Sequence, residues 1–142
     1  MRALYLSLSA PIAAAALLAA WIIHPDARYT IGSSLQLFAA LIIGHVIADY
    51  PLQGDFLARA KNRSNPIPGV PWYQALGAHA LIHGGTVWLM TGYWWLGALE
   101  VGCHALIDDT KCRSAIGFNA DQVLHVLCKA IWAAIAIAAI SH

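Results

Sequence analysis

Charged residues are scarce in this sequence of 142 residues. They make up only 11% of the chain, whereas 60% of its residues are hydrophobic, and the mean hydropathy is +0.63. Soluble domains of this length seldom have such a composition, so the sequence predicts an integral membrane protein. A basic excess is also missing, since eight Lys and Arg stand against seven Asp and Glu. We therefore expect no nucleic-acid partner and no acidic disordered tail.

Cysteine is equally sparse and follows no motif. The three cysteines, Cys103, Cys112 and Cys128, form no CxxC pair and are odd in number. This pattern argues against a disulfide framework and against a zinc site built from cysteines. We expect three free thiols.

Long uncharged runs separated by polar turns predict an all-α fold, a polytopic membrane helix bundle in a single domain, 1–142. At about 20 residues per span, the expected helices cover about 4–23, 31–49, 72–90, 94–109 and 121–140. The first run resembles a signal peptide, but its apolar core exceeds the roughly 7–15 residues of a signal sequence. We therefore expect a retained helix. The stretch 50–71 is expected to be a loop.

Basic residues predict the orientation of this bundle. Five crossings put the N-terminus and the loops 50–71 and 110–120 on one side of the membrane. That side carries Arg2, Arg59, Lys61, Arg63, Lys111 and Arg113, whereas the other carries only Arg28. The positive-inside rule makes the first side cytoplasmic. We expect an inner-membrane protein with its N-terminus inside and C-terminus outside, in contact with membrane lipids. Its oligomeric state stays open, and a homo-oligomer is one option.

Ionisable side chains lie within the predicted spans, where each is costly. They form four pairs spaced i, i+4: His45 with Asp49, His79 with His83, His104 with Asp108, and Asp121 with His125. This spacing puts both members of a pair on one helix face. A single pair is better explained as a histidine satisfied by a neighbouring polar group, but four pairs on four helices favour a functional site. The helix directions place all four pairs in the cytoplasmic half, which predicts one polar cluster.

Imidazole together with carboxylate is a ligand set of Zn, Fe or Mn. The eight paired residues are therefore candidate ligands for one or two divalent ions, with Zn favoured. One catalytic Zn needs only three protein ligands, so the surplus allows a second ion, orienting groups or a general base. Asp49, Asp108 and Asp121 are candidate proton acceptors. Asp108 is favoured because the like charge of its neighbour Asp109 favours proton uptake.

Residues beside the pairs have further candidate roles. Glu100 is grouped with the catalytic candidates because it lies four residues before His104, where it either orients that imidazole or makes a structural hydrogen bond. Candidate substrate-binding residues are Lys111, Asp55 and Gln122. Turn formation explains Asp55 almost as well. For Lys129, snorkelling or pairing with an Asp is favoured over substrate binding.

The strings around the pairs resemble a known family. They are HVIADYPLQGDF at 45–56, HALIDDTK at 104–111 and DQVLH at 121–125, together with His79, His83 and Glu100. Over about residues 35–132 they resemble a family of small bacterial and phage-associated membrane proteins classed only as a domain of unknown function. The ligand pattern is also similar to the broader set of membrane-bound metal-dependent hydrolases. The family itself implies no activity.

These features favour an intramembrane metal-dependent hydrolase. An activated water would attack an ester, amide or phosphoester of a lipid-like or membrane-associated substrate at the cytoplasmic leaflet. The alternative is a divalent-metal transporter or ion pathway, because His and Asp pairs on membrane helices are similar to the ion sites of cation exporters. A transporter is expected to show internal repeats, and we find none. A two-iron oxidase is weaker because only 79–83 resembles its histidine clusters. A purely structural protein would not need this cluster.

Overall fold

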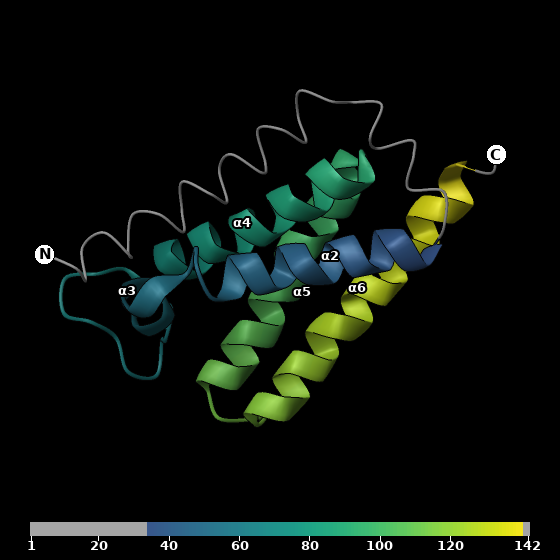
Figure 1. Cartoon of the computed structure of the whole chain (residues 1–142). Helices are drawn as coiled ribbons and strands as arrows, with labels where there is room; N and C mark the ends of the chain where they lie inside the picture. Colours follow the sequence, from purple (N-terminus) through teal and green to yellow (C-terminus); the bar gives the residue numbers. More distant parts are fainter. Residues whose placement is uncertain (1–33, 141–142) are drawn as a thin grey trace, which may run out of the picture.

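The computed structural model describes residues 34–140, and these residues form five α-helices and no strand (Figure 1). The helices are α2 (Ser34–Asp49), α3 (Gly54–Ala60), α4 (Trp72–Thr91), α5 (Trp94–Cys112) and α6 (Phe118–Ile140). The predicted all-α fold is therefore confirmed for this part of the chain. The helix predicted over 4–23 lies outside the described residues.

One additional helix and two helix limits differ from those expected. The short helix α3 lies within 50–71, which was expected to be a loop, α5 continues to Cys112, and α6 begins at Phe118. The axes of α2 and α3 meet at 86°. Pro51 lies in the break between them, and proline cannot continue a helix. Seven residues are too few for α3 to show a clear helical period, so turn-forming residues dominate this stretch of sequence.

The main packing contact joins α4 to α5. Gly92 ends α4 with a φ of 80°, and its backbone N–H donates to the carbonyl of Trp88 at 2.8 Å. The chain then turns directly into α5. A Cβ built on Gly84 would lie 2.6 Å from the carbonyl oxygen of Gly97. The two backbones therefore approach so closely that only glycine fits between them.

The interior of the bundle is divided along its length. One half is an apolar core of Leu37, Leu41, Val87, Leu96, Trp132, Ala133 and Ala136. The other half holds the buried histidines and acids. The division follows from helix direction: α2 and α5 carry their His and Asp pairs in their C-terminal halves, α6 carries its pair in its first half, and α4 carries its two histidines near its middle. Successive antiparallel helices thus bring these residues to one level.

Hydropathy alone identifies few membrane spans in the described residues. The segment Phe118–Ala139 is long and apolar enough to cross a membrane, and α2 with α3 forms a second such segment only if the bent pair counts as one span. The predicted spans 72–90 and 94–109 do not meet this measure, since histidines and acids interrupt their apolar runs. This measure is weak support for membrane insertion and leaves the polytopic arrangement unconfirmed.

Candidate metal centre

The four helices α2, α4, α5 and α6 bring the predicted pairs together in one cluster. In each of the three His and Asp pairs, an imidazole nitrogen lies close to a carboxylate oxygen. The distances are 3.3 Å from Nε2 of His45 to Oδ2 of Asp49, 3.6 Å from Nε2 of His104 to Oδ2 of Asp108, and 3.5 Å from Nε2 of His125 to Oδ1 of Asp121. The ring centroids of His79 and His83 are 4.7 Å apart. All five of these histidines are at most 3% exposed. The imidazoles are thus packed against one another, away from solvent.

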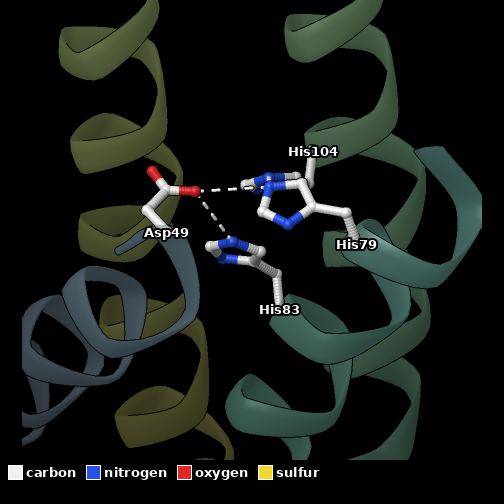
Figure 2. Close-up of side chains that lie close together, drawn as sticks. All are labelled: Asp49, His79, His83 and His104. Atoms are coloured by element: carbon white, nitrogen blue, oxygen red, sulfur yellow. Dashed lines mark hydrogen bonds and ion pairs between the residues drawn. The ribbon is translucent and has the colours of Figure 1, made fainter. Parts of the chain in front are cut away.

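A first group of ligand atoms comes from α2, α4 and α5 (Figure 2). Oδ1 of Asp49 lies 3.3 Å from Nε2 of His79 and 3.1 Å from Nε2 of His83. Nε2 of His79 in turn lies 3.1 Å from Nε2 of His104. One ligand atom from each of these four residues falls within 4.8 Å of the others. Tetrahedral ligands placed 2.0–2.1 Å from a zinc ion are about 3.3 Å apart, so this group is suited to hold a metal ion.

A second group shares one residue with the first. His104, Asp108 and His125 offer ligand atoms within 4.8 Å of one another. Oδ2 of Asp108 faces His104 at 3.6 Å, and Oδ1 faces His125, also at 3.6 Å. The two oxygens of Asp108 therefore point to different imidazoles. The described residues could hold one ion or two.

The hydrogen-bonding needs of these buried atoms also suit a cation. Nε2 of His79 faces three atoms: Asp49 Oδ1 at 3.3 Å, Asp108 Oδ2 at 3.4 Å and His104 Nε2 at 3.1 Å. A neutral imidazole nitrogen carries at most one hydrogen, so it cannot donate fully to both carboxylate oxygens. A metal ion accepts lone pairs from several ligands at once. The residues present therefore fit a metal ion better than they fit a closed hydrogen-bond network.

His45 borders the first group without belonging to it. Its Nε2 contacts Oδ2 of Asp49, and its Nδ1 lies 3.4 Å from Nδ1 of His83. It thus contacts the oxygen of Asp49 that faces away from the ligand group. This position suits a residue that orients Asp49.

Asp121 borders the second group. Its Oδ2 accepts a hydrogen bond from Gln122 at 3.0 Å and lies 3.3 Å from Nζ of Lys111. Its Oδ1 is buried and lies 3.5 Å from Nε2 of His125. Six of the eight predicted ligands thus fall into the two groups, and His45 and Asp121 lie beside them.

A buried polar layer separates the cluster from the apolar core. Oε1 of Glu100 lies 3.4 Å from Nδ1 of His104 and 2.5 Å from Nζ of Lys129, and Oε2 accepts a hydrogen bond from the indole N–H of Trp132 at 2.6 Å. Glu100 therefore contacts the imidazole and also makes structural hydrogen bonds. Lys129 is only 1% exposed, and its partner is Glu100, where an Asp partner or snorkelling was expected.

Sequence reasoning missed the position of Lys61. It was expected among the basic residues at the membrane surface, but it is 6% exposed and its Nζ lies 2.5 Å from Oδ2 of Asp108. No local pattern links two residues 47 positions apart. Asp109 instead lies 3.4 Å from an Arg63 nitrogen and 3.2 Å from an Arg113 nitrogen. Because these arginines compensate its charge, the repulsion expected at Asp108 is weak.

A small cavity of about 70 Å³ opens beside the cluster. It is lined by Asp49, Tyr50, Gln53, Lys61, Asp108, Lys111, Phe118, Asp121 and Gln122. Lys111 and Gln122, both predicted to bind substrate, are among these residues. Asp55 is exposed in the first turn of α3 and does not line the cavity.

The cysteines take no part in either ligand group. All three are free thiols, as expected. Burial, followed by the charge of the Asp108 carboxylate, raises the pKa of the Cys112 thiol at the end of α5. Cys112 is therefore protonated at neutral pH, which does not suit a metal ligand or nucleophile.

A family model described as "Protein of unknown function (DUF3307)" matches residues 37–142. The chain belongs to this family. Every residue of the two ligand groups lies within the matched range. Membership confirms the expected resemblance to a domain of unknown function. No curated protein and no solved structure matches the chain.

Proposed function

We propose that this DUF3307 protein is a bacterial or phage-associated, membrane-embedded metal-dependent hydrolase, with zinc as the favoured ion. The proposal is carried by the buried His and Asp ligand groups beside a cavity lined by acids, lysines and amides. Its substrate is a lipid-like or membrane-associated ester, amide or phosphoester. A bound divalent ion would supply Lewis-acid character and a water whose pKa is lowered towards 7.

The distribution of side chains supports the membrane location. Histidines, acids and lysines fill half of the interior, while large apolar side chains face outward, including Leu35 (73% exposed), Trp94 (67%) and Leu106 (70%). An outer surface of this kind suits lipid, and interior-facing ionisable residues are typical of functional sites in membrane bundles. Averaging hydropathy over whole helices hides this arrangement in α4 and α5, because their polar residues lie on the inner face.

The basic end of the bundle supports the proposed orientation. Arg63 and Arg113 both pair with Asp109, so the segment after α3 and the end of α5 lie together. The positive-inside rule places this end, and with it the cavity, at the cytoplasmic leaflet of the inner membrane, where lipids are the expected partners. The N-terminus is then inside and the C-terminus outside.

A topology reporter tests this orientation. A reporter fused to the C-terminus is expected to show a periplasmic location, because the last helix would end outside. The same reporter inserted in the loop at 113–117 is the control and is expected to be cytoplasmic. A C-terminal reporter found in the cytoplasm would contradict the proposed topology.

Asp121 is the proposed proton acceptor. Asp49 and Asp108 belong to the ligand groups, whereas Asp121 lines the cavity outside both groups. We therefore propose Asp121 for the role that the sequence favoured for Asp108. A water oxygen forms a bond to the substrate carbon or phosphorus, its proton passes to Asp121, the bond to the leaving group breaks, and Asp121 returns the proton to that group.

Reconstitution separates this proposal from metal transport. The purified full chain is placed in lipid vesicles with Zn, Fe or Mn, and metal content, lipid products and metal flux are measured on the same sample. We expect at least one bound ion per chain, accumulating hydrolysis products and no flux. Metal-dependent flux without hydrolysis would overturn the hydrolase proposal and favour a metal transporter. Failure to bind metal at neutral pH, where histidine is deprotonated, would overturn both functions.

A further inference from the structure

We propose that the cavity beside the metal centre binds a phosphate monoester group. This inference rests on the proposed hydrolase and narrows its substrate class. Two lysines from separate elements line the cavity: Lys61 directly follows α3, and Lys111 lies in the last turn of α5. Two amide side chains, Gln53 and Gln122, complete the polar wall. Ammonium and amide N–H groups are the donors that phosphate oxygens need.

Each lysine pairs with a carboxylate of the cluster. Nζ of Lys61 lies 2.5 Å from Oδ2 of Asp108, and Nζ of Lys111 lies 3.3 Å from Oδ2 of Asp121. Asp108 is also one of the candidate ligands. A metal ion held by Asp108 would take over the negative charge that now compensates Lys61. Lys61 is only 6% exposed, so its charge would then require another anion nearby.

The charge balance of the cavity also favours phosphate. Three aspartates and two lysines line it, which leaves one negative charge in excess. One bound divalent ion would change the net charge of the cavity from −1 to +1, and a second ion would make it more positive. A phosphate monoester carries about −1.5 to −2 charges at pH 7, whereas carboxylic esters and amides are neutral. Of the three substrate classes, only the phosphorylated one compensates the metal-loaded cavity.

The size of the cavity fits the head of such a substrate. Its volume is about 70 Å³, counted as space for the centres of water-sized spheres, and about 10–15 Å³ of such space holds one water molecule. A small tetrahedral group fits this volume, but an acyl chain does not. Tyr50 and Phe118 line the cavity and are 62% and 57% exposed. These aromatic side chains suit the apolar remainder of a lipid that lies outside the cavity.

Calorimetric titration with inorganic phosphate tests the site. The full chain in detergent is used metal-free and zinc-loaded, after excess zinc is removed. Wild type is compared with Lys61→Met, Lys111→Met and the control Arg113→Met, which removes a charge that pairs with Asp109 outside the cavity. We expect each lysine variant to weaken phosphate binding by about tenfold or more, because a charged hydrogen bond is lost. The control is expected to change it less than about twofold.

Metal content measured on the same samples separates the two proposals. If the proteins bind metal but all four have equal phosphate affinity, or none binds phosphate, the phosphate site would be overturned. The proposed hydrolase would not be affected by that result. Lysine-dependent phosphate binding by a protein that takes up no metal would overturn the hydrolase and also the charge balance from which the phosphate site is argued. If Lys61→Met fails to fold, Lys111→Met still tests the phosphate site. The Lys111 side chain is 34% exposed, so its replacement is not expected to prevent folding.

Two substrates distinguish the source of the phosphate group. Phosphatidic acid in vesicles and glycerol 3-phosphate in solution carry the same monoester. Release of inorganic phosphate from phosphatidic acid alone would identify a lipid headgroup, and release from the soluble ester alone would identify a free phosphate ester. Either result supports the site. If the protein hydrolyses a carboxylic ester or an amide but releases inorganic phosphate from neither substrate, the proposed phosphate site would be overturned.

Discussion

Replacement of His104 by Ala is expected to abolish both metal binding and hydrolysis. His104 is the residue shared by the two ligand groups, and its Nε2 lies 3.1 Å from Nε2 of His79 and 3.6 Å from Oδ2 of Asp108. Its loss therefore removes a ligand from either one-ion or two-ion occupancy. The measurement is metal per chain in purified protein, with helix content by circular dichroism as the check on folding.

His45→Ala is the matched control for this experiment. His45 is equally buried, but it contacts Asp49 from outside the ligand groups. Loss of such an orienting residue typically weakens metal affinity by about 10–100-fold, so saturating metal is expected to restore occupancy and activity. Full metal content in folded His104→Ala, or irreversible metal loss in His45→Ala, would contradict the ligand assignment.

Asp121→Asn is expected to keep the metal and lower the hydrolysis rate by roughly a hundredfold or more, the usual scale for loss of a general base. The amide preserves the shape of the side chain and its contacts with Gln122 and Lys111, but it cannot take a proton. The measurement is the single-turnover rate of the metal-loaded protein, with metal content determined in parallel. Asp109→Asn serves as the control, because Asp109 pairs with two arginines outside the cavity.

The corresponding Asp108 variant shows which aspartate accepts the proton. Asp108 lies in the second ligand group, so Asp108→Asn is expected to lower the metal content. If instead Asp108→Asn keeps its metal and loses the rate, while Asp121→Asn retains wild-type turnover, the proton acceptor is Asp108. That result would overturn the role proposed for Asp121.

The helical period allowed the paired residues of the site to be predicted from the sequence. Residues four apart lie on one helix face whatever the rest of the chain does. The pairs His45 with Asp49, His104 with Asp108, and Asp121 with His125 are accordingly in contact. Helix direction similarly indicated that all pairs lie in the same half of the bundle. The extent of α4, Trp72–Thr91, also agrees closely with the predicted range 72–90.

The sequence by itself thus determined the helical class, the residues that share each helix face and the level at which the polar faces meet. Only the tertiary structure decided which faces touch. It places His79 against Asp49 and His104, buries Lys61 on Asp108, and pairs Lys129 with Glu100. The reason is physical: helix periodicity is a local property, whereas the rotation and packing of one helix against another depend on contacts between residues far apart in the chain.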